Sequence, residues 1–464
     1  MILKVFALLP LLISYCVTAN AAQHPNVIII YCDDLGYGDI GCFGSTKHRT
    51  PNIDQLSSEG LTLTNFYVTS GVCTPSRSSL MTGCYPKRIG MHQNEKGGWV
   101  LFPGNQQGLN PQETTIAEVL KQAGYATKIV GKWHLGDQPE FLPTRQGFDS
   151  YFGIPFSNDM GYWIPERNYP PLPLMRDESV IEQEPDQSQL TKRYTEEAIS
   201  FVENNKSNPF FLYWPHTFPH VPLYASDAFK GKSKNGIYGD AVEEIDWSVG
   251  ELTKALKRLN LEKNTFVIFT SDNGAAQRWG GSNGRLKGYK GSTWEGGMRV
   301  PCIMKWPATI PAGTVSRDIA STLDILPTLA NIVGQKLPDD HIIDGLDLSP
   351  MLANPLEVNS PRDTMYYYYQ SHLCAVRHEN WKLHVRPSKA NVGPNYQPEL
   401  YNLENDMGET RSVYDEHPEV VYRLTELIEF CRKDLGDGNL PGKNTREPGF
   451  VKEPQTLTVK PTTE

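Results

Sequence analysis

One cysteine in a small polar turn is the residue of this sequence best placed to do chemistry. Cys73 is followed by Pro75 and then by three serines, and proline is tolerated in the first turn of a helix. We therefore predict that Cys73 lies at a helix N-terminus, where unpaired backbone N–H groups favour negative charge. Arg77 lies one turn further on, close enough to reach an anion held there. A lone cysteine at a helix start is also a common small core residue, so its neighbours in space must distinguish the two roles.

Oxygen ligands follow two short apolar segments that have the pattern of buried parallel strands. These segments, residues 26–31 and 265–270, each end in polar side chains and then a glycine. The four side chains are Asp33, Asp34, Asp272 and Asn273. Ligands of open α/β sheets bind at the carboxyl ends of strands, and adjacent carboxylates repel each other unless a cation is present. Two such strand ends side by side would place four oxygens around one hard cation, such as Ca²⁺ or Mg²⁺.

Basic side chains follow two further predicted strands, residues 125–130 and 209–214. The side chains concerned are Lys132 and His134 after the first strand, and His216 and His220 after the second. The first two alternate along an extended segment, so we expect both to point to one face. Two histidines after a strand end occupy a natural position for acid and base chemistry. Any one of these residues alone would more often be a satisfied structural group.

A glycine-rich, basic stretch, residues 280–297, carries Lys290 but lacks the spacing of a phosphate-binding P-loop. A second long segment, residues 139–189, has no clean periodicity, and we expect an irregular excursion that shapes a substrate pocket. Its aromatic side chains could stack on a sugar or pack the loop itself: Tyr162, Trp163 and Tyr169. Residues 239–259 have the pattern of an amphipathic helix, with Asp246 expected on its solvated face.

The elements that must position these residues indicate an α/β fold. Buried strands alternate with helical segments up to about residue 345, where the composition shifts to Pro, Asp and Asn. Residues 364–385 then have the pattern of an antiparallel meander, and residues 418–432 that of a closing helix. We predict a catalytic domain over residues 22–345 and a smaller α+β subdomain over residues 346–464, loosely ordered after Gly436.

In order and spacing, these motifs resemble the type I sulfatase family of the alkaline phosphatase superfamily, in particular its arylsulfatase and N-acetylgalactosamine-6-sulfatase-like members. Cys73-x-Pro75-x-Arg77 with the Ser-Ser-Leu-Met-Thr-Gly that follows is similar to the first family signature. Lys132-Trp-His134-Leu-Gly is similar to the second. The resemblance covers most of residues 26–306 and, more loosely, the C-terminal region. It implies a large mixed, mostly parallel sheet sandwiched by helices, and a smaller C-terminal antiparallel sheet with a helix.

The resemblance also implies the cofactors. In the family, a formylglycine-generating or sulfatase-maturating enzyme oxidises the cysteine to Cα-formylglycine (3-oxoalanine), whose hydrated aldehyde is the nucleophile. One divalent cation, usually Ca²⁺, binds the two polar pairs together with an oxygen of the modified residue. Carried over to this sequence, the modified residue is Cys73. The implied metal ligands are Asp33, Asp34, Cys73, Asp272 and Asn273.

Catalytic roles follow from the same resemblance. The implied catalytic residues are Cys73, Arg77, Lys132, His134, His220 and Lys290, and the implied substrate-binding residues are Lys132, His220 and Lys290. The nucleophile displaces the alcohol at sulfur while His220, with Lys290, protonates the leaving oxygen. His134 then takes a proton from the second hydroxyl, which expels sulfate and restores the aldehyde. His216 is the second choice for the histidine after residues 209–214.

Two alternatives stay open at this point. A phosphonate monoester or phosphodiester hydrolase of the same superfamily can use the same Cys-x-Pro-x-Arg motif. A non-catalytic module that binds sulfated glycans would keep Cys73 unmodified. The motif around Lys132 and the presence of Lys290 favour sulfate ester hydrolysis, and export together with the long loop favours a sulfated polysaccharide or oligosaccharide as the substrate.

The composition and the first residues of the chain limit its binding partners and its cellular location. The 464-residue chain carries a formal net charge of −9, which argues against nucleic acid or an anionic membrane as a partner. Residues 1–21 have the pattern of a secretory signal peptide with a small-x-small cleavage site, and we expect no membrane anchor. We therefore expect export, most simply to a periplasm, with secretion or a lysosome as alternatives. Export permits disulfides, but the sequence leaves six cysteines either paired or free: Cys32, Cys42, Cys84, Cys302, Cys374 and Cys431.

Overall fold

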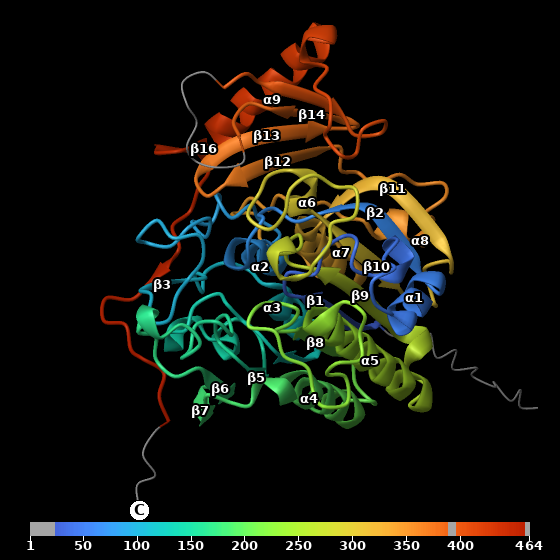
Figure 1. Ribbon diagram of the computed structural model, residues 1–464, viewed down its shortest axis with the longest axis vertical. Coiled ribbons are helices and arrows are strands. Elements are labelled where there is room, and N and C mark those ends of the chain that lie inside the picture. The colour runs from blue at the N-terminus through green and yellow to red at the C-terminus, as the bar shows by residue number, and fades with distance from the viewer. Residues whose placement is uncertain (1–23, 388–395, 460–464) are drawn as a thin grey trace, which may run out of the picture.

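The computed structural model describes residues 24–387 and 396–459 (Figure 1). The predicted signal peptide, residues 1–21, lies outside the described residues. A large mixed sheet with helices on both faces forms the body of the molecule, and a smaller sheet with one helix lies at one end (Figure 1). This arrangement confirms the predicted fold class.

The large sheet has ten strands in the order β11-β2-β10-β9-β1-β8-β4-β5-β6-β7. Its central strands are parallel: β1 pairs with β8 and β9, and β4 pairs with β8 and β5. β10 is antiparallel to both of its neighbours. The bounds are β1 Asn26–Cys32, β2 Leu61–Tyr67, β4 Ala126–Val130, β5 Ser150–Gly153, β6 Pro173–Arg176, β7 Ser179–Gln183, β8 Phe210–Pro215, β9 Thr265–Ser271, β10 Arg299–Lys305 and β11 Thr314–Ser321.

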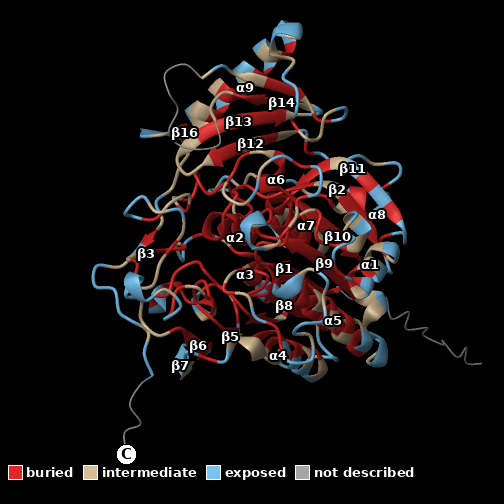
Figure 2. Ribbon diagram, in the orientation of Figure 1, coloured by how far each residue is buried: buried red, intermediate tan, exposed pale blue. Residues whose placement is uncertain are grey.

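The apolar run of β1 is explained by burial on both of its faces. All seven residues of β1 are buried, as the central strands in Figure 2 show. Alternate side chains enter two separate cores, since Val27 belongs to one hydrophobic cluster and Ile28 to the other. A strand covered on both faces needs no polar side, which is why its sequence is continuously apolar.

Two sets of helices provide those cores. α2 Cys73–Thr82, α3 Ile116–Gln122 and α7 Ile325–Ile332 contribute to the first cluster, while α1 Pro51–Ser58, α4 Leu190–Asn204 and α5 Gly236–Arg258 contribute to the second. The remaining helices are α6 Glu295–Met298, α8 Ser349–Ala353 and α9 Pro418–Leu435. Among the described residues, no helix is long and apolar enough to cross a membrane.

The smaller sheet matches the predicted antiparallel meander. β12 Thr364–Tyr369, β13 His372–His378, β14 Trp381–His384 and β15 Glu399–Asn402 follow one another in order. α9 packs on this sheet through Leu424, Ile428 and neighbouring apolar side chains. α8 falls within the predicted C-terminal part of the chain, yet it packs against α7 of the large domain.

Two expectations about the large domain differ from the structure. The segment 139–189 is not wholly irregular, because β5, β6 and β7 extend the large sheet at its edge. Asp246 is buried rather than solvated: its carboxylate accepts hydrogen bonds from the backbone N–H groups of Asn52 and Ile53, in the first turn of α1. It therefore joins α5 to α1.

The stretch after Gly436 also differs from the loosely ordered tail that we expected. β16 Gly436–Asp437 pairs with β17 Leu440–Pro441, and β18 Gly449–Phe450 pairs with β3 Gln107–Gly108. This part of the chain runs back along the large domain past β3 (Figure 1). Arg446 anchors it through an ion pair with Glu113, at an Nε–Oε1 distance of 2.7 Å. The described cysteines are all free thiols.

Candidate active site

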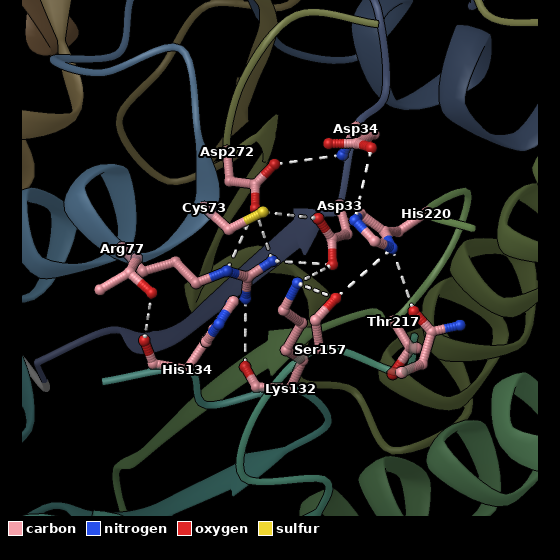
Figure 3. Close-up of polar contacts among 12 residues, drawn as sticks. Asp33, Asp34, Cys73, Arg77, Lys132, His134, Ser157, Thr217, His220 and Asp272 are labelled. Carbon is pink, nitrogen blue, oxygen red and sulfur yellow. Dashed lines mark hydrogen bonds and ion pairs between the residues drawn. The ribbon is translucent and has the colours of Figure 1, made fainter. Parts of the chain in front are cut away.

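Four neighbouring strand ends bring the candidate residues together. β9, β1, β8 and β4 are adjacent in the sheet and parallel, so their carboxyl ends lie at one edge. The last residues of β1 and β9, Cys32 and Ser271, are paired in register, which places the two polar pairs that follow side by side. Figure 3 shows the side chains that meet there, among them Cys73 and Arg77 of α2. The predicted juxtaposition of the two pairs is what the structure shows.

Cys73 is the first residue of α2 and lies at the floor of the site. Its side chain is 2% exposed, and its thiol donates to Asp33 Oδ1 at 3.4 Å. Lys290 Nζ lies 3.7 Å from the sulfur. Burial, reinforced by the charge of Asp33, raises the pKa of the Cys73 thiol above its usual range, although Lys132 and Lys290 oppose this. The surroundings therefore do not activate an unmodified thiol as a nucleophile.

The polar pairs around Cys73 have the composition of a hard-cation site. Asp33, Asp34, Cys73 and His220 each offer a ligand atom, and these atoms all lie within 4.8 Å of one another. The amide of Asn273 donates to Asp34 Oδ1 at 2.8 Å, while its own Oδ1 is buried and has no hydrogen-bond partner among the residues that the structure describes. A buried acceptor without a partner is costly, and a cation held by carboxylates and this oxygen would satisfy it.

The two carboxylate oxygens of Asp272 have different partners. One oxygen, Oδ1, accepts a hydrogen bond from the backbone N–H of Asp34 at 3.1 Å, and the other, Oδ2, faces Arg77. Burial and the nearby charge of Asp33 raise the pKa of Asp272, against the effect of Arg77. The opposite holds for Asp33: burial would raise its pKa, but Lys132, with smaller contributions from other cations, holds it well below its usual range.

Arg77 does not reach into the cavity as its position in the sequence suggested. Its side chain is fully buried, and Nη2 and Nε both donate to Asp272 Oδ2, at 2.7 and 3.1 Å. Its Nη1 donates to the carbonyl oxygen of Lys132 (Figure 3). Arg77 therefore compensates a carboxylate and ties α2 to the segment after β4, rather than facing an anion directly.

Two lysines supply the remaining positive charge. Lys132 Nζ lies between Asp33 Oδ2, at 2.5 Å, and Ser157 Oγ, at 3.2 Å, and its side chain is fully buried. Lys290 Nζ lies 2.7 Å from Asp34 Oδ1, and its side chain is 22% exposed. Lys290 is therefore the one of this pair that also lines the cavity. Three carboxylates and three basic side chains thus face one another around Cys73.

His220 has one nitrogen held by the protein and one turned to the metal-site carboxylates. Nδ1 lies 3.1 Å from Asn158 Oδ1 and 2.5 Å from the carbonyl oxygen of Val221, so it is the nitrogen that carries a proton. Nε2 lies 3.8 Å from Asp34 Oδ2. Burial, with the charge of Lys290, lowers the pKa of His220. His216, the second choice, packs against Trp214 in the core, and neither of its ring nitrogens has a partner.

His134 reaches the same cavity through an unusual backbone conformation. Its φ angle is +63°, so the segment after β4 is not the extended one that we expected. Nε2 lies 3.0 Å from the carbonyl oxygen of Leu101, and Nδ1 is buried without a partner. Burial, with the charge of Lys132, lowers the pKa of His134, so the imidazole is neutral at pH 7.

A cavity of about 410 Å³ opens above Cys73. His134, His220 and Lys290 line it together with residues that sequence reasoning did not single out: Val72, Gly98, Trp99, Val100, Phe102, Ser157, Asp159, Met160 and Arg167. The last four come from the segment 139–189, as expected of a pocket-shaping loop. Within that segment, Tyr169 stacks on Phe102, whereas Tyr162 and Trp163 are exposed. Loop residues without periodicity give no sequence signal for such a role.

Known proteins resemble this chain over most of its length. The family described as Sulfatase matches residues 25–335, and the one described as N-sulphoglucosamine sulphohydrolase, C-terminal, matches residues 289–434. N-acetylgalactosamine-6-sulfatase of Canis lupus familiaris is 40% identical over 383 residues, which cover 79% of this chain and 72% of that protein. Arylsulfatase A of Homo sapiens is 37% identical over 462 residues, which cover 90% of this chain and 89% of that protein.

A solved structure agrees with these matches. Ps i-CgsB, in complex with k-i-k-neocarrahexaose, is 32% identical to this chain with a TM-score of 0.77, covering 88% of this chain and 92% of that one. The family match extends over more than half of the sequence, and it contains Cys73, both polar pairs and the basic residues of the site: Arg77, Lys132, His134, His220 and Lys290. This chain therefore belongs to the type I sulfatases of the alkaline phosphatase superfamily and is a sulfuric ester hydrolase.

Proposed function

We propose that this enzyme hydrolyses sulfate monoesters on a sulfated carbohydrate, with Cys73 converted to Cα-formylglycine and one divalent cation, Ca²⁺ or Mg²⁺, in the site. The observation that carries the proposal is the buried charge cluster around Cys73. Lys132 and Arg77 are fully buried beside Asp33 and Asp272, at the floor of a cavity. Such a concentration of charges is costly as a purely structural device, which supports a role in binding an anion and a cation.

The residues present fit the implied cation. Asp33, Asp34, Asp272 and Asn273 would hold it, with the side chain at position 73 completing the set, and the unpartnered Oδ1 of Asn273 would gain a partner. When bound, the cation and the hydrated aldehyde would supply a nucleophile close to anionic at neutral pH. A thiol whose pKa is raised by burial does not supply that nucleophile.

Basic residues of this chain would neutralise the negative charge of the sulfate ester. A sulfate monoester is a poor electrophile because its outer oxygens carry negative charge, so the site must cancel that charge. Lys290, at the cavity wall, and Lys132, beneath it, are the residues that we assign to this task.

Two histidines would handle the protons. Because Asn158 and the Val221 carbonyl hold Nδ1 of His220, its Nε2 is the nitrogen left to pass a proton to the leaving oxygen. Because Nδ1 keeps its proton, only the imidazolium form of His220 carries a proton on Nε2. The lowered pKa makes that form a stronger acid but leaves the ring mostly neutral in the free site, so His220 would have to gain this proton when the anionic substrate binds. His134 is neutral and has an unpartnered Nδ1, so we assign it as the base that takes a proton from the group at position 73.

A sulfated carbohydrate is the substrate class with most support. The solved relative described above binds a carrahexaose, and the curated relative is named for N-acetylgalactosamine 6-sulfate chemistry. We further propose that the chain is exported and that a formylglycine-generating or sulfatase-maturating enzyme modifies Cys73. Both proposals rest on the expected signal peptide and on the motif from Cys73 to Arg77.

The decisive test combines mass spectrometry with turnover. Protein from the native host should yield a peptide with 3-oxoalanine at position 73, and it should release sulfate from 4-nitrophenyl sulfate faster than it hydrolyses a 4-nitrophenyl phosphonate ester. Cys73→Ser should lose sulfate release while keeping the circular dichroism spectrum and melting temperature of the parent, because the two side chains differ by one atom. Normal sulfate release from this variant, or from protein with an unmodified thiol, would overturn the proposed mechanism.

A further inference from the structure

A second cavity lies beside the one above Cys73. It measures about 380 Å³ and shares Trp99 and Lys290 with the active-site cavity. Its other lining residues come from the glycine-rich stretch: Lys287, Gly288, Tyr289, Gly291, Ser292 and Trp294. Both volumes fall within the range of small-molecule sites, about 300–1,000 Å³. The two cavities are therefore neighbours, with Trp99 and Lys290 in the lining of both.

The second cavity is lined by aromatic rings. Trp99 is 42% exposed and Tyr289 is 44% exposed, and Trp294 is half-buried between them and the smaller sheet. Aromatic rings combine a broad apolar face with a polar edge, so they suit ligands that have both kinds of surface. A pyranose ring is such a ligand, because one face carries C–H groups and its rim carries hydroxyls. Large exposed aromatic side chains next to a catalytic cavity thus favour a bound sugar.

The charge of the second cavity favours an anion. Lys287 and Lys290 both line it, and none of its eight lining residues, all within the described chain, is acidic. Lys287 Nζ lies 3.7 Å from the centre of the Trp294 ring and donates one hydrogen bond, to the carbonyl oxygen of Glu409. An ammonium group has three donors, so Lys287 can still bind a sulfate or carboxylate. This local positive charge stands out in a chain of net charge −9.

The wall between the cavities is built to be rigid. Trp99 meets the ring of Tyr369 edge-on, with centroids 5.2 Å apart. Gly291 has a φ of +80°, and a Cβ added to it would lie 2.8 Å from the Trp99 ring, so only glycine admits this close approach. Asn94 holds the preceding turn, as its Oδ1 accepts the backbone N–H of Gly98 and its Nδ2 donates to the carbonyl oxygen of Val100. A ring fixed in advance costs little entropy when it binds a ligand.

We propose that the second cavity binds the sugar unit next to the one that bears the scissile sulfate, and that this neighbouring unit carries an anionic group. This inference rests on the proposed function. Trp99 and Tyr289 contact the sugar ring, and Lys287 binds its sulfate or carboxylate. The preferred substrate is therefore an oligosaccharide with at least two acidic or sulfated units, rather than a single sulfated sugar.

The test compares a substrate that fills both cavities with one that fills only the first. We would measure kcat/KM for tetrasaccharides of chondroitin 6-sulfate and of ι-carrageenan, and for 4-nitrophenyl sulfate, and take the ratio for the better tetrasaccharide. Tyr289→Ala and Trp99→Ala should each lower this ratio by roughly 10-fold, the size expected for loss of one aromatic contact. Lys287→Gln should lower the ratio and weaken its dependence on salt, and Lys287→Arg should restore most of it.

Controls separate the subsite from the proposed function. Tyr422→Ala removes an exposed tyrosine of α9, 70% exposed and outside both cavities, and should leave the ratio unchanged. Melting temperatures of all variants check that they fold. If the parent cleaves glycans but the Trp99, Tyr289 and Lys287 variants keep its ratio, the subsite is wrong and the proposed function stands. If the parent cleaves 4-nitrophenyl sulfate and neither tetrasaccharide, the carbohydrate assignment and the subsite both fail. Release of sulfate from none of these compounds would overturn the proposed function itself.

Discussion

Arg77 shows how a single residue of the signature serves the site without lining the cavity. Its guanidinium is fully buried and lies against Asp272, with Asp33 3.6 Å away. Two donors of this planar guanidinium, Nε and Nη2, converge on one oxygen of Asp272, and lysine cannot reproduce that geometry. Arg77 therefore orients Asp272 and opposes the effect of burial on its pKa, which nevertheless remains raised.

Replacement of Arg77 should be costly to the fold. Arg77→Met keeps the length of the side chain but leaves Asp272 buried without its partner, and we expect a loss of about 3–5 kcal/mol in the free energy of unfolding. Urea unfolding in the presence of calcium measures this loss. Arg49→Met is the matched control, since Arg49 forms an exposed ion pair with Glu243 and should cost less than about 1 kcal/mol. Equal losses for the two variants would contradict the assigned role.

At the residue scale, the sequence predicts which residues form the site better than it predicts the directions of their side chains. The strand-end positions of Asp33 and Asp272 follow from sheet topology and bring both to the site of Cys73. The family resemblance, rather than a strand end, pointed to Lys290, and the structure places it 3.7 Å from the Cys73 sulfur. The direction of Arg77 was not predictable in the same way. A side chain one helical turn from Cys73 can face the cavity or the sheet, and only the position of Asp272 on another strand decides between them.

The end of β4 shows how an element places two candidate residues. Gly131 follows β4 with a φ of +128°, and its backbone N–H donates to the carbonyl oxygen of Phe152 in β5. A Cβ at this position would lie 1.8 Å from the carbonyl oxygen of Pro215 in β8. Three strand ends therefore approach as closely as backbone allows, and this is what brings Lys132 under Asp33.

We expect Gly131→Ala to abolish sulfate release and to destabilise the fold by more than about 4 kcal/mol, because backbone must move to admit the methyl group. Gly124→Ala provides the control. Gly124 also has a positive φ, +86°, but no atom lies within 4 Å of its added Cβ, so it should cost only about 1–2 kcal/mol. Thermal unfolding and sulfate release from 4-nitrophenyl sulfate check both variants. Near-parental activity of Gly131→Ala would show that the strand ends are not so tightly fixed.

At the element scale, long periodic or wholly apolar segments were predictable and short edge strands were not. β1 and β9 are continuous apolar runs because both of their faces are covered. β5, β6 and β7 have four or five residues each and extend the sheet at its margin, so local pattern cannot distinguish them from a loop. The strand β11 was missed for a similar reason, since exposed and buried residues alternate irregularly along it.

At the scale of the whole molecule, a buried polar network joins the two sheets. Lys382 of β14 donates to Glu295, the first residue of α6, at 2.9 Å and lies 3.0 Å from Glu409. His384 contacts Glu409 at 2.8 Å, and the Glu295 backbone N–H donates to the same carboxylate. All four side chains are fully buried. Since Lys290 lies only a few residues before Glu295, the smaller sheet helps to fix the loop that carries it.

This network should make the free energy of unfolding depend on pH in the acidic range. Burial opposes ionisation of Glu295, but Lys382, Arg377 and Arg299 lower its pKa to about 2. An unfolded glutamate has a pKa of about 4.3, so the folded state binds fewer protons between these values. The stabilisation is therefore complete above about pH 4.5 and is lost as the pH falls toward 2.

Glu295→Gln tests this directly. The variant should be less stable than the parent at pH 6. The difference between the urea unfolding midpoints of parent and variant should become smaller between pH 4.5 and pH 3. Glu251→Gln is the control, because Glu251 forms an exposed ion pair with Lys254 on α5. A gap that stays constant across this range would mean that the charge on Glu295 does not contribute as described.

The sequence did not predict this network or the return of the C-terminal stretch. Residues such as Glu295 and Lys382, 87 positions apart, are brought together only by the docking of one sheet on another. The pairing of β18 with β3 likewise joins residues more than 300 positions apart, and two-residue strands have no pattern of their own. Hydrophobic patterns in the sequence predict local secondary structure well, whereas contacts between sheets depend on the assembled fold.

The burial of α2 has a consequence for when the proposed modification of Cys73 can take place. All ten residues of this helix are buried, and Cys73 is 2% exposed. The enzyme proposed to modify Cys73 would need to bind the peptide around it, and that peptide is buried in the folded protein. The proposed oxidation would therefore have to precede the burial of α2, and its rate would compete with the rate of folding. On this proposal, a chain that folds before oxidation would keep the thiol, and a mutation that speeds folding would lower the fraction of active enzyme.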